Sequence, residues 1–241
     1  MLTYASWRDI KTREIPDKVW IIFSAPAIGI DLYELHIERI NTIQFFLAII
    51  LSLVISFSLA YFELFGGADF KAFVVLSLLQ PIQARFINPI LNTVSVIYPL
   101  TVFANSAIAG AFTAIITLVK NIVLTYTKGG LFENDQKISL TKKLLVMVSG
   151  VKMNIDKVRG PPFEYPLEKI EGNERKLMVM SRLLRDEDAV EAIKTLKEVG
   201  FKEIWVSRTL PFLVFITIGF ILSIFLGDII LWIIYSILIP G

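Results

Sequence analysis

The feature that most constrains this chain is an apolar run at residues 43–65, in which Glu63 is the only charged side chain. A helix needs ~20 predominantly apolar residues to cross the hydrocarbon core of a bilayer, which is roughly 30 Å thick. The run therefore predicts a membrane-spanning helix. We expect an α-helical multi-pass membrane protein with about five visible spans, because further apolar blocks meet or approach this length. They occupy residues 19–32, 72–79, 97–118 and 210–239.

The composition agrees with a membrane protein and excludes several kinds of chemistry. Hydrophobic residues make up 55% of the 241 positions, which is more than an ordinary soluble domain contains. The absence of cysteine excludes disulfides and thiolate catalysis, and the single histidine, His36, excludes a polyhistidine metal site. A net charge of +2 gives no reason to expect nucleic-acid binding. We therefore expect no metal, no cofactor and no nucleic-acid partner.

The composition changes between residues 127 and 208, where sixteen Lys or Arg and thirteen Asp or Glu occur. This charge density predicts a soluble insertion before the last span. An acidic start at residue 186 and a stop at Gly200 predict a helix inside it. Flanking strands are expected at 176–184 and 201–206, which makes the insertion a small α+β domain. The expected organisation is an N-terminal transmembrane region at 1–126, the insertion at 127–208 and a C-terminal transmembrane segment at 209–241.

Basic residues near the apolar runs predict the orientation of the chain. Cytoplasmic loops of membrane proteins carry an excess of Lys and Arg. The N-terminal segment, the loop that contains Lys71 and the 127–208 insertion are basic, whereas the opposite loops carry only Arg39 and Arg85. Alternating spans put the three basic segments on one side. We therefore expect a multi-pass protein of the cell membrane, with these three segments in the cytoplasm.

Two acidic segments stand at the expected cytoplasmic boundary. Residues 9–17 read DIKTREIPD, and residues 66–69 read GGAD between two spans. Pro16 and Asp17 predict a helix start, because proline suits a first helical turn and an acid suits the positive end of the helix dipole. Glycines allow a tight turn or the close approach of another backbone. Ionisable residues at membrane depth are candidates for function, although residues 66–69 alone fit an ordinary interfacial loop equally well.

The two segments together carry a resemblance to a known family. The first has the pattern D-x-[KR]-x-x-x-I-P-[ND], and the second is a variant of G-x-G-D. They resemble the type IV prepilin and preflagellin peptidases, which belong to the membrane aspartyl proteases named for the G-x-G-D motif. The charged insertion, which ends with EIWV at residues 203–206, resembles the archaeal preflagellin branch in particular. So do Tyr98-Pro99 and the FAN sequence at residues 103–105.

The resemblance implies that Asp9 and Asp69 are the catalytic pair, which makes residues 1–126 the catalytic region. Ala68 stands where the motif has a strict glycine, which adds one small side chain. Lys71 fits the family pattern after the acid, in a role of orientation or substrate contact. The supporting motif residues implied by the resemblance are Gly66, Gly67, Ala68 and Lys71.

Family members carry a full apolar span before the first acid. Only eight residues precede Asp9 in this chain, and they form about 12 Å of helix. A sixth, N-terminal span is therefore either truncated in this chain or short.

A pair of aspartates can hydrolyse a peptide bond with water alone. One carboxylate takes a proton from water, and the other carboxyl donates a proton to the carbonyl oxygen or the leaving amine. Neighbouring carboxyls do not both ionise easily and titrate as a unit, so the two roles are not divided between Asp9 and Asp69. The resemblance implies that the partners are flagellin-like or pilin-like precursors with class III-type signal peptides, in contact with the lipid bilayer. A weaker candidate for supporting the pair is Glu63.

Two other functions remain open at this stage. A presenilin-like protease would cut inside membrane helices, but that group has its first acid in a Tyr-Asp setting, whereas Asp9 follows Arg8. A transporter or assembly scaffold would use the acids for ion or subunit contacts, although we find no internal repeat of the kind common in transporters. His36 is expected to be a solvated loop residue, and Asp228 an interfacial acid in the last apolar block.

Overall fold

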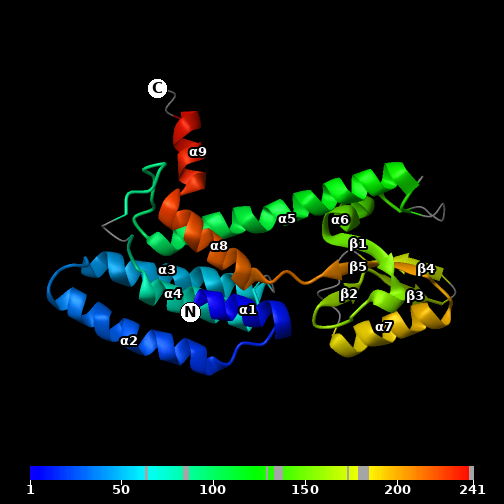
Figure 1. Ribbon diagram of the computed structural model, residues 1–241, viewed down its shortest axis with the longest axis horizontal. Coiled ribbons are helices and arrows are strands. Elements are labelled where there is room, and N and C mark those ends of the chain that lie inside the picture. The colour runs from blue at the N-terminus through cyan, green and yellow to red at the C-terminus, as the bar shows by residue number, and fades with distance from the viewer. Residues whose placement is uncertain are drawn as a thin grey trace. The chain divides into compact units, whose positions relative to one another are not determined.

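The computed structural model describes residues 1–62, 65–83, 87–128, 130–132, 138–172, 174–178 and 185–238. These residues form two compact units, one made of Met1–Gly110 with Pro211–Gly241 and the other of Ala111–Leu210 (Figure 1). The first unit is helical, and the second contains the sheet. Glu63 and Arg85 lie outside the described residues.

The helical unit is built from both ends of the chain. Its N-terminal part supplies α1 to α4 and the beginning of α5, and its C-terminal part supplies α8 and α9 (Figure 1). The helix bounds are α1 Leu2–Thr12, α2 Asp17–His36, α3 Thr42–Tyr61, α4 Gly67–Leu79, α5 Tyr98–Lys128, α8 Phe212–Phe225 and α9 Ile229–Leu238.

Local sequence explains where several of these helices begin. Helix α2 starts at Asp17 directly after Pro16, as predicted. Helix α3 starts after Asn41, whose Oδ1 accepts a hydrogen bond from the Gln44 backbone N–H at 3.1 Å, which is the usual role of Asn before a helix. Helix α5 runs ten residues beyond the predicted end at residue 118, because apolar residues resume after Lys120 and Asn121.

One apolar cluster joins the helices that carry the candidate acids. It contains Ala5 of α1, Ala72 of α4 and Leu213 of α8, together with residues of α2 and α5. Ala68, the residue before Asp69, packs against the same cluster. Burial of apolar surface contributes roughly 25 cal/mol per Å², so this shared core fixes the three helices within one packed unit.

The described residues bear out a helical protein with candidate membrane spans. Within them, Thr42–Tyr61 and Tyr98–Thr127 are long and apolar enough to cross a membrane. Helices α8 and α9 make a third candidate if the pair, bent by 54°, counts as one span. Helix α4, with 13 residues, and α2, which carries several charges, are not among these candidate spans. The number of about five spans stays a prediction.

The bend between α8 and α9 is held by buried polar contacts. Gly227 has φ +95°, and a Cβ at this position would lie 2.4 Å from the Thr93 carbonyl oxygen. Asp228 is buried, and its carboxyl accepts hydrogen bonds from the Thr101 hydroxyl at 3.0 Å and the Leu231 N–H at 2.9 Å. Asn105 donates to the Gly227 carbonyl oxygen at 2.8 Å. Asp228, expected as an interfacial acid, therefore caps α9 inside a packed region.

The second unit confirms the predicted small α+β domain. Strand β5 pairs antiparallel with β1 and β2 in the order β1-β5-β2, and β3 and β4 form a separate antiparallel pair. The predicted helix and last strand correspond to α7 and β5. The predicted strand at 176–184 corresponds to β4 only at its start, since residues 179–184 are not described. The bounds are α6 Leu140–Ser149, β1 Gly150–Asn154, the 3-10 helix η1 Ile155–Lys157, β2 Glu164–Pro166, β3 Glu168–Glu171, β4 Glu174–Leu177, α7 Asp186–Glu198 and β5 Glu203–Arg208.

Candidate active site

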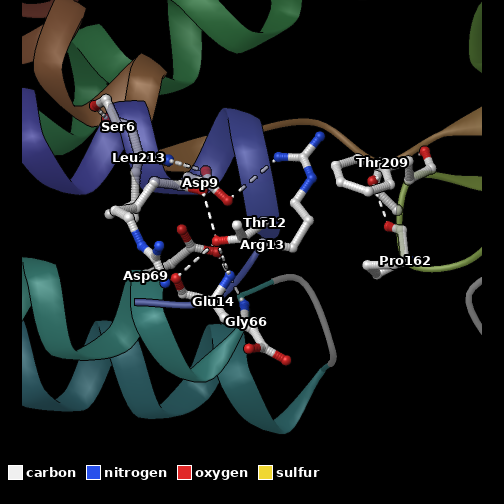
Figure 2. A network of polar contacts seen from close by, with 12 residues as sticks. Ser6, Asp9, Thr12, Arg13, Glu14, Gly66, Asp69, Pro162, Thr209 and Leu213 are labelled. Carbon is white, nitrogen blue, oxygen red and sulfur yellow. Dashed lines mark hydrogen bonds and ion pairs between the residues drawn. The ribbon is translucent and has the colours of Figure 1, made fainter. Parts of the chain in front are cut away.

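Asp9 lies in the last turn of α1 with 8% of its surface exposed. Its Oδ1 accepts a hydrogen bond from the Arg13 guanidinium at 3.3 Å, and its Oδ2 accepts one from the Leu213 backbone N–H at 3.4 Å. Figure 2 shows the carboxyl between these two donors. The contacts are long, and both donors are positively charged or positively polarised groups.

The contact with Leu213 places Asp9 at the N-terminus of α8. The first N–H groups of a helix have no acceptor within the helix, and the helix dipole makes this end attractive to an anion. Helix α8 follows Pro211, and no side chain at that position caps it. The carboxylate of Asp9 therefore supplies, from α1, a cap that the sequence around α8 lacks.

Ser6 adds a second polar link between the same two helices. Its hydroxyl donates to the Leu213 carbonyl oxygen at 3.0 Å and lies 2.7 Å from the Thr217 hydroxyl oxygen. Ser6 precedes Asp9 by three residues and so lies on the same face of α1. Together the two side chains fix the rotation of α1 against α8 (Figure 2).

Arg13 ends α1 in a left-handed backbone conformation, with φ 58° and ψ 11°. Its N–H donates to the Asp9 carbonyl oxygen at 3.2 Å, and its guanidinium returns to the Asp9 side chain. Glycine is the residue that usually occupies such a position, because a Cβ costs free energy there. Arg13 occupies this position in spite of the cost, and its side chain contacts the buried Asp9.

Asp69 lies in the first turn of α4 and is half-buried. Its Oδ2 accepts a hydrogen bond from the Gly66 N–H at 3.0 Å, as Figure 2 shows. This is the arrangement of an acid that stabilises its own helix start. Both candidate acids therefore belong to helix ends, Asp9 beside the start of α8 and Asp69 at the start of α4.

Gly66 and Gly67 differ from the tight turn that the sequence suggested. Gly66 has the extended values φ −76° and ψ 164°, and Gly67 begins α4, so neither needs the left-handed region. Within the part of the chain that the structure describes, a Cβ at Gly67 would meet no atom within 4 Å, and one at Gly66 would meet Asp69 Oδ2 at 3.4 Å. Both residues are exposed. Their missing side chains leave open space beside Asp69.

Lys71 pairs with the acid that begins α2. Its Nζ lies 2.6 Å from Asp17 Oδ1, and both side chains are substantially exposed. An exposed pair of this kind contributes about 0–1 kcal/mol to stability. The contact links the start of α4 to the start of α2.

Sequence reasoning missed Arg13, Ser6 and Leu213. The spacing of Asp9 and Arg13 is a signal that was available, since residues four apart in a helical segment are neighbours. Leu213 carried no signal, because its contribution is a backbone N–H. His36 is exposed at the end of α2. Among the described residues, no group of three or more His, Cys, Asp or Glu is arranged to hold a metal ion.

Comparisons with known proteins agree with this architecture. A family model described as "Type IV leader peptidase family" matches residues 1–129, and one described as "Archaeal Peptidase A24 C-terminus Type II" matches residues 142–229. The preflagellin peptidase of Methanococcus maripaludis is 24% identical over 94% of this chain and 92% of its own length. The preflagellin peptidase of Methanocaldococcus jannaschii is 26% identical, over 98% and 94% respectively. No solved structure matches the chain.

The apolar helices and these matches define a membrane protease. More specifically, the chain belongs to the type IV leader peptidase family, whose model covers more than half of its length.

Proposed function

We propose that this protein is an aspartic endopeptidase that removes the short basic leader from flagellin-like or pilin-like precursors at the cytoplasmic face of the membrane. The observation that carries the proposal is the placement of two acids at helix ends in a helical unit of a leader peptidase. One acid is buried between Arg13 and the α8 start, and the other borders an open glycine pair.

Asp9 and Asp69 would act together on one water molecule. One carboxylate takes a proton from the water while the water oxygen attacks the scissile carbonyl carbon. The other carboxyl protonates the carbonyl oxygen. The C–N bond then breaks as the leaving nitrogen receives a proton. The roles belong to the pair as a unit. For this chemistry the two carboxyls must come within reach of the same water.

The substrate follows from the names of the relatives and from the open start of α4. Two relatives are preflagellin peptidases, so we infer a flagellin-like precursor. Its apolar helix would lie in lipid beside the spans, and the junction with the basic leader would reach the acids in extended form, because a helical peptide bond is shielded. The space at Gly66 and Gly67 suits a peptide strand.

The topology belongs to the same proposal. Residues 1–126 would form the catalytic transmembrane region, 127–208 a cytoplasmic insertion and 209–241 the last transmembrane segment. Reporter fusions near Gly172 and near Glu38 test this orientation. We expect cytoplasmic exposure at the first position and external exposure at the second, and the reverse pattern would contradict it.

The activity is tested by co-expression with a candidate precursor and a mobility shift on cleavage. Asp9→Asn and Asp69→Asn should each reduce cleavage by about 100-fold or more, since positioned acid–base groups typically contribute 10²–10⁴-fold. Asp17→Asn is the matched control, because asparagine also serves at a helix start. Near-normal processing by either of the first two variants would refute the catalytic pair.

The cleavage site separates this function from a presenilin-like one. Cutting at the junction between leader and apolar helix, blocked by a bulky residue before the cut, supports leader removal. Efficient cutting in the middle of the apolar helix would support the presenilin-like protease instead.

A further inference from the structure

Helix α6 exposes leucines on the side that the sheet unit leaves uncovered. The exposed fractions are 84% for Leu140, 55% for Leu144 and 46% for Leu145. On the opposite side, Val146 is fully buried and packs with Leu131, Leu167 and Trp205. The helix is therefore apolar on two sides, and only one of them has a protein partner among the described residues.

Helix α6 is also basic. Its charged residues are Lys142, which is exposed, and Lys143, which is half-buried with its Nζ 5.6 Å from the centre of the Phe132 ring. Exposed leucines combined with lysines are typical of helices that lie in the interface of a membrane. Each basic residue near an anionic lipid surface contributes about 1 kcal/mol to binding.

Helix α6 is docked on the C-terminal half of α5. The buried side chain of Asn121 donates hydrogen bonds to the carbonyl oxygens of Met147 and Gly150, both at 2.7 Å. Leu124 of α5 packs against the cluster that contains Val146. Figure 1 shows α6 beside this half of α5. The position of α6 is therefore fixed relative to a candidate membrane span.

The same half of α5 presents apolar side chains outward as far as its last turn. The exposed ones include Phe112, Ile115, Ile116, Val119, Val123 and Tyr126. Lys120 is exposed among them, and a lysine in such surroundings extends its charge toward the lipid headgroups. Helix α6 is attached at Asn121, the residue after Lys120.

We propose that α6 lies in the headgroup region of an anionic lipid surface, with Leu140, Leu144 and Leu145 in contact with the acyl chains and Lys142 near lipid phosphates. Two observations favour lipid over a protein partner: α6 is attached to the half of α5 that presents exposed apolar side chains, and the exposed Lys142 matches an anionic surface. The contact holds the sheet unit at the membrane, and it does not depend on the catalytic assignment.

The chain has no cysteine, so a single spin label can be placed at will in the full-length protein. Leu144→Cys reports on α6. Val190→Cys is the matched control, because Val190 on α7 is 56% exposed against 55% for Leu144. Both labelled proteins are reconstituted in vesicles that contain phosphatidylglycerol. We expect the label at 144 to be reached severalfold better by oxygen than by a water-soluble nickel chelate, and the label at 190 to show the reverse preference.

Two results would overturn the proposal. Equal access of the nickel chelate at 144 and 190 would place α6 in water. Low access of both reagents at 144 would indicate a protein neighbour, such as a second copy. The lysine contribution is tested by Lys142→Glu in the Leu144→Cys background, with Lys194→Glu on α7 as control. The first change should reduce the oxygen preference at 144, and an unchanged preference would refute the role of charge.

Discussion

The carboxyl of Asp9 accepts a hydrogen bond from the backbone N–H of Leu213, which lies 204 residues further along the chain. Helix α1 thereby caps the N-terminus of α8. The acid that the family resemblance assigns to catalysis thus also stabilises the packing of α1 on α8. Variants at Asp9 should therefore be compared for folding as well as for cleavage.

Arg13 should act on cleavage through Asp9 and not through the fold. Arg13→Gly removes the guanidinium but suits the left-handed backbone at φ 58°, so it should relieve about 1–2 kcal/mol of strain. We expect cleavage to fall by about tenfold or more, which corresponds to roughly 1.4 kcal/mol in the activation free energy. The melting temperature in detergent should change less than that loss suggests, because the relieved backbone strain offsets part of the lost ion pair with the buried Asp9.

Arg13→Lys is the companion variant, since it keeps the charge and the strained backbone. It should retain more activity than Arg13→Gly despite equal or lower stability. If activity instead follows stability across the two variants, the guanidinium does not position Asp9.

Gly67→Val should reduce cleavage without unfolding the protein. Among the described residues, a Cβ at Gly67 meets no atom within 4 Å, so the new side chain would begin in the space beside Asp69. Gly29→Val is the matched control, because Gly29 is also helical and a Cβ there would likewise meet no described residue within 4 Å. Precursor cleavage is measured by mobility shift, and equal activity of the two variants would mean that substrate does not approach Gly67.

Gly227→Ala should destabilise the helical unit, since its Cβ would lie 2.4 Å from the Thr93 carbonyl oxygen at φ +95°. Strain of this kind costs about 1–3 kcal/mol before the clash is added. Gly172 has φ +64°, and a Cβ there would meet no atom of the described residues within 4 Å, so Gly172→Ala should cost only the backbone strain. Thermal unfolding in detergent compares them, and equal losses would contradict the packed bend.

Arg175→Leu should destabilise the sheet unit by about 3–5 kcal/mol at neutral pH, the usual cost of leaving a buried charge unpaired. Arg175 contacts Glu168 at 2.6 Å, and Glu168 is 3% exposed. Burial raises the pKa of Glu168, and Arg175 opposes that rise. Without Arg175, protonation of Glu168 removes the unpaired buried charge. The loss of unfolding free energy should therefore shrink as the pH falls through the raised pKa of Glu168.

The control for this variant is Lys176→Leu, because Lys176 pairs with the exposed Glu171. Its effect on the unfolding free energy should be within about 1 kcal/mol. A loss for Arg175→Leu that does not vary with pH would show that the charge of Glu168 is not its cause.

Short-range signals predicted several elements of the fold. Proline followed by an acid located the start of α2 at Asp17, and the acidic turn before an apolar stripe located α7. These features act within one helical turn, so they are visible in the sequence. Composition likewise revealed the apolar helices and the charged unit between them.

The surroundings of the candidate acids were beyond such signals. The cap on α8 joins Asp9 to a backbone N–H whose residue type is irrelevant. The glycines at 66 and 67 indicated only that the backbone can adopt many conformations. They did not indicate that Gly66 is extended and that Gly67 is helical. The α8–α9 bend depends on buried side chains from α5, such as Asn105.

The dependence of Asp9 on Leu213 has a consequence for the order of synthesis. A ribosome releases the chain from its N-terminus, so Asp9 emerges early and Leu213 only after the whole sheet unit has been made. Until then the acid lacks its backbone donor on α8. A nascent or prematurely ended chain would thus hold Asp9 without its partner on α8, and the packing of α1 on α8 would be completed only at the end of translation.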